Sequence, residues 1–287
     1  MQYLAPTTVT EAVNLLRDQR GESRILAGGT DLLVRMKSDM VDPDTVIDIK
    51  RIDAMRQITK EGDTWRIGAA VSGAEMAEHA ALVADWPGVV EATNLIGSTQ
   101  VQGRCTMAGN LCNASPAADS VPAMVAAGAL ARVAGRDGTR DVPVQDIPVS
   151  PGKTSLAKAE LVEAILLPAR PARSADAYLR FIPRTEMDIA VVGCAVSLTL
   201  DDAGLCTDAR VSLGAVAPTV LLVPDAATAL IGTSLDDAAL DALAAACSAA
   251  AKPIDDKRGT VEFRVHVAGV LAKRAALAAK KRAGDTA

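Results

Sequence analysis

The sequence predicts an α+β protein made of three consecutive units. Helical and strand patterns alternate within the first part of the chain. A second region combines them around a long loop of small residues, and a third joins a strand hairpin to alanine-rich helices. Such patterns are typical of layered folds in which helices cover a sheet. We place the units at residues 1–55, 56–174 and 175–287.

The first unit is expected to run helix, strand, turn, helix, strand. Thr8-Val9-Thr10-Glu11 has the spacing of a capping box, which predicts a helix to about Arg20. A strand at Arg24–Leu26 ends at Ala27-Gly28-Gly29-Thr30-Asp31, where helical periodicity restarts with the threonine as the expected cap. A strand at Thr45–Ile49 closes the unit.

The second unit holds the longest irregular stretch. Ser72-Gly73-Ala74-Glu75 repeats the capping-box spacing and predicts a helix start. A helix around Gly88–Ile96 and another around Val121–Ala127 flank a loop from Gly97 to Ser120 that is rich in Gly, Ser, Asn and Pro. A hairpin turn is expected at Asp137-Gly138.

The third unit begins after an interrupted segment, Pro168-Ala169-Arg170-Pro171-Ala172-Arg173-Ser174. Alternating residues at 190–200 and 205–216 predict a hairpin, and alanine-rich helices are expected at about 236–251 and 260–282. The basic residues near the C-terminus are interpreted as the solvated face of the last helix.

Composition excludes several classes of function. A net charge of -5 and a pI near 5.2 argue against a nucleic-acid partner. Apolar runs are too short for a membrane span and no signal-peptide pattern begins the chain, so we expect a cytoplasmic protein. Only six residues are aromatic, so a flat cofactor must be held mostly by backbone and aliphatic contacts. Five scattered cysteines without a CxxC pair are expected to be reduced thiols.

Two loops have the pattern that presents free backbone N–H groups to an anion. In the first, Ala27–Asp31, glycines permit positive φ and a close approach of phosphate. The second runs from Thr106-Met107-Ala108-Gly109-Asn110 through Asn113 to Asp119, and its small and amide residues leave many backbone groups needing partners. Plainer interpretations are a common Gly-Gly turn and an Asn-rich loop satisfied by its own turns and water.

Other nucleotide and metal motifs are incomplete. No GxGxxG occurs, so a Rossmann site is not expected. Pro151-Gly152-Lys153-Thr154-Ser155 ends like a P-loop, but Ile147 stands at the position of its first glycine and no strand-to-helix pattern surrounds it. His79 and His266 lie far apart in the sequence and are interpreted as surface or capping residues.

At the two loops the sequence resembles the FAD subunit of carbon monoxide dehydrogenase and the flavin domain of xanthine dehydrogenase. That family's first flavin loop reads AGGxS or AGGTD, and Ala27–Asp31 matches it. The second reads TIGGN followed by ASPxxD, matched by Thr106–Asn110 and Ala114–Asp119. The resemblance implies a two-subdomain FAD-binding fold of the vanillyl-alcohol-oxidase or PCMH type. It also implies a C-terminal α/β domain like that of the CO dehydrogenase flavoprotein, beginning near Ala175.

The resemblance further implies which residues bind FAD without a covalent bond. By position, Ile96 and Asp119 are expected near the ring and ribityl chain, and Arg180 is expected to approach the flavin and tune its reduction potential. Asn110 and Asn113 are expected to bond polar cofactor atoms. The full expected set is Leu26, Ala27, Gly28, Gly29, Thr30, Asp31, Leu32, Ile96, Thr106, Ala108, Gly109, Asn110, Asn113, Asp119 and Arg180.

Three departures from the family pattern stand at the second loop. The chain has Gln102-Gly103 where the family usually has Arg-Asn, Cys105 where it has Gly, and Ala108 where it has a second Gly. The alanine adds a methyl group where backbone should pass close to phosphate. Cys105 can be read as a covalent flavin attachment or redox thiol, or as a buried small residue in place of glycine, and we favour the second.

The resemblance implies an oxidoreductase subunit that passes electrons from [2Fe-2S] clusters to NAD, a quinone or oxygen. Because the chain lacks cluster-binding cysteine spacing, the clusters are expected on a small partner and molybdopterin on a large one, commonly in a dimer of heterotrimers. The large subunit would choose the substrate, so carbon monoxide, a purine, an aldehyde and an N-heterocycle stay open. The alternatives are a stand-alone flavin oxidase of the same fold and a flavin-free scaffold subunit.

Overall fold

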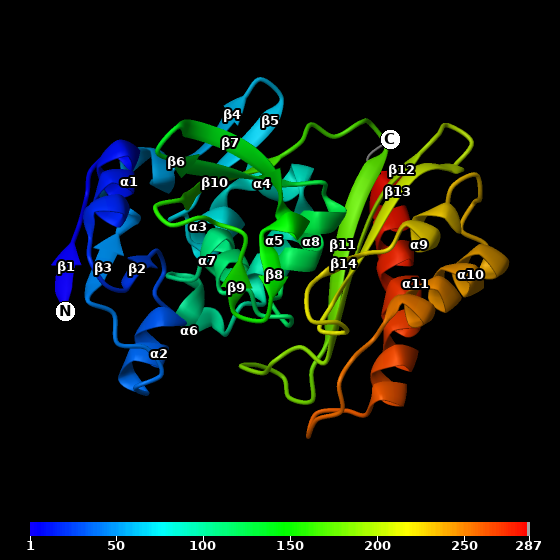
Figure 1. Cartoon of the computed structure of the whole chain (residues 1–287). Coiled ribbons are helices and arrows are strands. Elements are labelled where there is room, and N and C mark those ends of the chain that lie inside the picture. Colours follow the sequence, from blue (N-terminus) through cyan, green and yellow to red (C-terminus); the bar gives the residue numbers. More distant parts are fainter. Residues whose placement is uncertain (286–287) are drawn as a thin grey trace.

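Three larger sheets and the helices packed on them form residues 1–285, the part of the chain that this computed structural model describes (Figure 1). The N-terminal sheet lies at one end of the molecule, the central sheet and its helices lie in the middle, and the C-terminal sheet lies at the other end. The mixture of helices and strands agrees with the α+β class predicted from the sequence.

A small parallel sheet forms the N-terminal end, with strand order β1-β3-β2. Its elements, with the helices around it, are β1 (Gln2–Leu4), α1 (Val9–Asp18), β2 (Ser23–Leu26), α2 (Leu32–Lys37), β3 (Thr45–Asp48), η1 (Ile49–Arg51) and η2 (Asp53–Arg56). All four residues of β3 are buried, because this strand is the middle one. Strand β2 is an edge strand, so the first glycine loop, which follows it, lies at an edge of the sheet.

The two helix starts of this unit differ from the sequence prediction in detail. Thr8 caps α1 as expected, since its Oγ1 accepts from the Glu11 N–H at 3.1 Å. The Glu11 carboxylate, however, accepts from the N–H of Thr7 at 2.8 Å. The prediction that Thr30 caps α2 was wrong. Asp31 stands at the N-cap with helical backbone angles and no side-chain bond, because the chain enters this helix without the extended cap residue that side-chain capping needs.

An antiparallel sheet of order β4-β5-β10-β6-β7 occupies the centre. Its strands are β4 (Ile58–Glu61), β5 (Thr64–Gly68), β6 (Leu130–Gly135), β7 (Gly138–Pro143) and β10 (Leu161–Leu167). The predicted hairpin turn is confirmed, with Gly135 paired opposite Gly138. After η3 (Val144–Asp146), a separate small hairpin pairs β8 (Pro148–Ser150) with β9 (Lys153–Thr154).

Short helices fill the space between the central sheet and the C-terminal sheet. They are α3 (Gly73–Glu78), α4 (Ala80–Asp85), α5 (Pro87–Asn94), α6 (Thr99–Gln102), α7 (Met107–Cys112) and α8 (Ser120–Ala126). The capping box at Ser72 is complete. The stretch predicted as one loop, 97–120, contains α6 and α7 instead. Small residues hid the second of these helices, which starts because Thr106 Oγ1 accepts from the Gly109 N–H at 2.9 Å.

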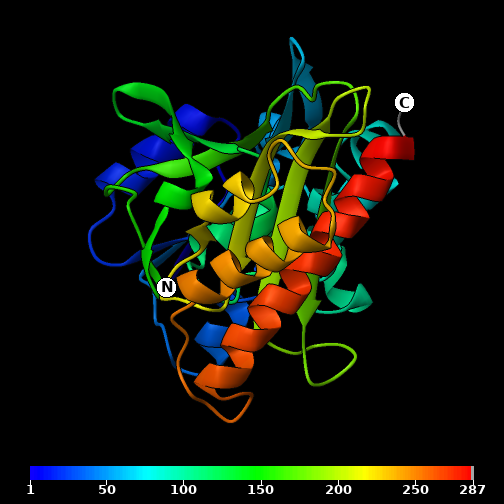
Figure 2. The ribbon, with the colours of Figure 1, turned by 90° about the vertical axis from the view of Figure 1, so that its right-hand side faces the viewer.

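The C-terminal sheet has the order β11-β12-β13-β14 and confirms the predicted hairpin and helices. Its elements are β11 (Ser174–Phe181), β12 (Val192–Leu200), β13 (Cys206–Gly214), β14 (Leu221–Leu222), α9 (Pro224–Thr228), α10 (Asp237–Ala250) and α11 (Val261–Asp285). Figure 2 shows α10 and α11 crossing the outer face of this sheet. Helices α5 and α8 pack against its strands from the molecule's interior.

Alanine-rich packing explains how close α11 comes to its neighbours. A Cβ added at Gly269 would lie 3.0 Å from the Ala244 carbonyl oxygen of α10. Small side chains let helix and sheet backbones approach, and this offsets the shortage of aromatic residues in the core. No helix in the described part of the chain is long and apolar enough to cross a membrane.

Buried apolar side chains form two clusters. One runs from the N-terminal sheet through the central sheet and its helices, and the other lies between the C-terminal sheet and α9–α11. Tyr178 and Ala195, which belong to the C-terminal sheet, are part of the first cluster. The C-terminal sheet is therefore packed directly onto the centre of the molecule. The division at residues 55 and 174 stays a prediction.

Candidate cofactor site

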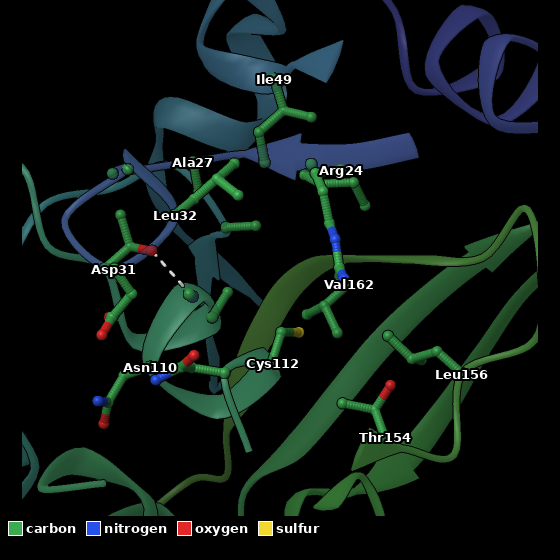
Figure 3. A pocket seen from close by; sticks show the side chains of 18 of the residues that line it. Arg24, Ala27, Asp31, Leu32, Ile49, Asn110, Cys112, Thr154, Leu156 and Val162 are labelled. Atoms are coloured by element: carbon green, nitrogen blue, oxygen red, sulfur yellow. Dashed lines mark hydrogen bonds between the residues drawn. The ribbon is translucent and has the colours of Figure 1, made fainter. Parts of the chain in front are cut away.

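A cavity of about 630 Å³ lies between the N-terminal sheet and the central helices (Figure 3). Strand β2 and the loop after it form one wall, α7 and the loop before it form a second, and residues 152–162 contribute a third. The volume suits a bound small molecule or cofactor. The fifteen residues expected from the sequence include twelve that line it: Ala27, Gly28, Gly29, Thr30, Asp31, Leu32, Ile96, Thr106, Ala108, Gly109, Asn110 and Asn113.

Gly28 allows the two loops to touch. A Cβ added there would lie 1.9 Å from the carbonyl oxygen of Arg104 and 3.1 Å from the Cα of Cys105. Both contacts are with backbone, which cannot rotate away as a side chain can. The glycine is therefore required by the neighbouring loop, in addition to any approach of a phosphate.

Gly29 turns the chain from β2 into α2. Its φ is 78°, in the left-handed region that glycine adopts without strain. An added Cβ would lie 2.7 Å from the Cδ1 atom of Leu26. Leu26 is thus packed under the loop, which explains why it belongs to the loop motif without lining the cavity.

Unpaired backbone N–H groups gather at the two loops. Within residues 1–285, none of the N–H groups from Gly28 to Leu32 donates to another protein group, and the same holds for Thr106, Met107 and Ala108. The N–H group that follows in each loop does have a protein acceptor. The Leu33 N–H donates to the Gly29 carbonyl at 3.0 Å, and the Gly109 N–H donates to Thr106 Oγ1 at 2.9 Å. Clustered free N–H groups with glycine between them bind anions. The residues present therefore fit a diphosphate such as that of FAD.

Asn110 lines the cavity, and its amide nitrogen is left free to donate. Its Oδ1 accepts from the Ser120 N–H at 3.1 Å and from the Ser120 hydroxyl at 2.7 Å. That oxygen is occupied, whereas Nδ2 has no protein partner in the described chain. Asn110 and Asp31 lie on the same side of the cavity in Figure 3. Burial raises the pKa of the Asp31 carboxyl, and Arg35 opposes that rise.

Asp119 and Arg180 do not line the cavity and instead form an ion pair with each other. Arg180 Nη1 donates to Asp119 Oδ2 at 2.8 Å and to the Leu95 carbonyl at 2.9 Å. The Tyr178 hydroxyl lies 3.4 Å from Asp119 Oδ1. Burial raises the pKa of Asp119 to about 6, and the charge of Arg180 opposes this rise. The direct flavin contacts expected of these residues stay predictions.

Two cysteines, Cys105 and Cys112, line the cavity as neutral thiols. Burial raises the pKa of the Cys105 thiol, and it raises that of Cys112 to about 12. Cys105 is 2% exposed. Because the thiolate is the nucleophilic form, these values favour the interpretation of Cys105 as a buried small residue. Residues 1–285 contain no group of three or more His, Cys, Asp or Glu side chains placed to hold a metal ion.

The third wall was missed by sequence reasoning. The segment rejected as a P-loop is the β8–β9 hairpin, and its Gly152 and Thr154 line the cavity. The Gly152 N–H donates to the Ala114 carbonyl at 3.0 Å, which fixes the hairpin to the second loop. No local sequence pattern predicts this contact. Arg24 was also missed, although it precedes the first loop. Its side chain extends from β2 toward Val162 in Figure 3.

Comparisons with known proteins show the family to which the chain belongs. Residues 1–170 match the family described as the FAD binding domain in molybdopterin dehydrogenase, and residues 177–279 match the CO dehydrogenase flavoprotein C-terminal domain. The chain is 34% identical to the carbon monoxide dehydrogenase medium chain of Afipia carboxidovorans, covering 98% of this chain and 97% of that protein. It is 29% identical to the putative xanthine dehydrogenase FAD-binding subunit of Escherichia coli, covering 98% and 97%.

Solved structures show the same arrangement. A chain in the crystal structure of the Cu,Mo-CO dehydrogenase superposes with a TM-score of 0.94 at 34% identity, covering 98% of both chains. The carbon monoxide dehydrogenase of Hydrogenophaga pseudoflava gives a TM-score of 0.93 at 34% identity and the same coverage. These likenesses confirm the predicted fold, an FAD-binding part followed by a CO dehydrogenase flavoprotein-like domain, and with it FAD as the cofactor.

Proposed function

Since this chain belongs to the family of FAD-binding subunits of molybdopterin-dependent dehydrogenases, we propose that it relays electrons from [2Fe-2S] clusters on a partner subunit to an external acceptor such as NAD, a quinone or oxygen. The observation that best supports this proposal is the cavity. Its two loops hold eight backbone N–H groups that have no protein partner in residues 1–285. FAD, when bound, exchanges one or two electrons and so links single-electron carriers to a two-electron acceptor.

The chain's own residues would bind and orient the cofactor. The Gly28–Leu32 and Thr106–Ala108 N–H groups suit the diphosphate, and the Asn110 amide suits a carbonyl or hydroxyl oxygen. Aliphatic side chains, among them Ile96, Leu156 and Val162, suit the flat rings. This division of roles accords with a chain that has only six aromatic residues.

The names of the relatives support partner subunits. One is a carbon monoxide dehydrogenase medium chain, and another is subunit alpha of the 6-hydroxypseudooxynicotine dehydrogenase complex of Paenarthrobacter nicotinovorans. For this chain we propose a small iron-sulfur partner and a large molybdopterin partner, assembled as a dimer of heterotrimers. The large partner would select the substrate. The cytoplasmic location expected from the sequence stays a prediction.

Anaerobic flavin absorbance tests the relay. The isolated chain, loaded with FAD, should be bleached by a strong chemical reductant, since this requires only the bound cofactor. The substrate of the complex should leave the isolated chain oxidised. Addition of the iron-sulfur and molybdenum subunits should make the same substrate bleach the flavin.

Three other outcomes would contradict the proposal, and two of them favour an alternative function. Rapid bleaching of the isolated chain by substrate would contradict the relay and favour a stand-alone flavin oxidase. A purified chain that takes up no FAD would favour the scaffold interpretation. A complex whose clusters are reduced by substrate while the flavin stays oxidised would also contradict the relay.

A further inference from the structure

Strand β11 of the C-terminal sheet holds both ends of helix α5. Near the start of the helix, Asp176 Oδ2 accepts from the Val89 N–H at 2.9 Å. Just past its end, Arg180 Nη1 donates to the Leu95 carbonyl at 2.9 Å. Residues 176 and 180 are an even number of positions apart, so their side chains leave the same face of the strand. Figure 1 shows β11 lying beside α5 and α8.

Arg180 reaches two walls of the cavity through two acceptors. One is the Leu95 carbonyl, and the next residue, Ile96, lines the cavity. The other is Asp119, at 2.8 Å, whose chain neighbour Ser120 donates twice to Asn110. Asn110 also lines the cavity. A single guanidinium nitrogen, Nη1, makes both of these bonds.

The pair is buried, which makes it rigid and intolerant of loss. The Arg180 and Asp119 side chains are 6% and 11% exposed. Removal of one member of a buried pair leaves the other charge uncompensated. We expect local backbone to shift so that water or another partner can reach that charge. The backbone that can shift is the segment Leu95–Ile96 and the segment Asp119–Ser120, both of which lead directly to the cavity.

We propose that Arg180 is a positioning residue, which holds Ile96 and Asn110 at the cavity walls through the Leu95 carbonyl and the Asp119 carboxylate. The C-terminal domain thereby takes part in shaping the FAD site without lining it. The inference rests on the FAD site of the proposed function and is independent of the electron relay. It differs from a direct electrostatic effect of the Arg180 charge on the flavin.

A double-mutant cycle on the full chain separates the two mechanisms. Arg180→Met is measured in the wild-type background and in the Ile96→Ala and Asn110→Ala backgrounds, by FAD titration and by the visible absorption and circular dichroism of bound FAD. In the wild-type background we expect the Kd for FAD to rise about tenfold, which corresponds to about 1.4 kcal/mol of binding free energy. We also expect a changed visible spectrum of the bound FAD. In each of the other backgrounds the fold-change should shrink, because the residue that Arg180 positions has been removed.

Two results would overturn the proposal. If Arg180→Met raises the Kd by the same factor and changes the spectrum in the same way in all three backgrounds, Arg180 acts on the flavin by its own charge and the proposal is overturned. A wild-type Kd and spectrum in a folded Arg180→Met chain would also overturn it. A chain that binds FAD but passes no electrons would refute the relay and leave this inference intact.

Two further variants keep the test interpretable. Arg180→Lys should restore most of the FAD affinity, since one nitrogen makes both bonds and an ammonium can replace it, and this variant serves where Arg180→Met does not fold. Failure of the lysine to restore affinity above the methionine variant would count against positioning by these two bonds. Arg282→Met is the matched control, because Arg282 pairs with Glu91 of α5 at 2.5 Å and donates to the Asp176 carbonyl, and neither partner lines the cavity. Its Kd should stay within about twofold of wild type.

Discussion

Gly28→Ala tests whether the two loops must touch for FAD to bind. The new Cβ would lie 1.9 Å from the Arg104 carbonyl oxygen, whereas ordinary contact begins at 3.4 Å, so the loops must separate by about 1.5 Å. Overpacking against backbone costs about 1–3 kcal/mol. We expect this loss of stability in the FAD-free chain. Because the free N–H groups of the two loops then no longer converge, we expect a comparable loss of FAD binding, about 5- to 150-fold.

Urea denaturation of the FAD-free chain and quenching of flavin fluorescence on binding measure the two effects. Gly103→Ala is the control, since an added Cβ there meets nothing within 4 Å and the residue has an ordinary φ of -68°. It adds the same methyl group next to Arg104 and should leave both quantities unchanged. If Gly28→Ala behaved like Gly103→Ala, the close contact between the loops would not be needed for binding.

Three further outcomes are expected. Gly29→Val should give a folded chain without FAD. A φ of 78° strains a branched residue, and the added Cβ would lie 2.7 Å from a Leu26 methyl carbon. Normal flavin content in that variant would remove the first loop from the site. Acid precipitation should release all flavin from the wild-type chain, since burial keeps the Cys105 thiol protonated, and colour left on the denatured protein would show a covalent bond. The pKa of Asp119 is raised to about 6, so the folded chain binds a proton more tightly than the unfolded chain. Wild type should therefore gain about 2 kcal/mol of stability over Asp119→Asn as the pH falls from about 7 to about 4, and a pH-independent difference between the two denaturation curves would contradict the raised pKa.

Local pattern was sufficient for the parts of this protein that depend on neighbours in the chain. The Gly28-Gly29 turn, the Thr8 and Ser72 caps, and the paired strands 192–200 and 206–214 all arise from interactions within a few residues or from simple alternation. The same local patterns marked the two loops as candidate anion sites, and their resemblance to a known family's motifs supplied the prediction that they bind a flavin. Where small residues hid the helical period, at α7, the same reasoning failed.

Only the tertiary structure decided which residues meet across the cavity. Arg180 and Asp119 are 61 positions apart, and their pairing depends on β11 packing against α8, whose N-cap residue is Asp119. Gly152 and Thr154 form a wall because a hairpin with no nucleotide motif is bonded to Ala114. Gly28 is needed for contact with Arg104, which no spacing rule within the first loop can show. Sequence patterns record the turns and periods of single elements, whereas these contacts depend on how separate elements pack, and that packing is set by the whole buried core.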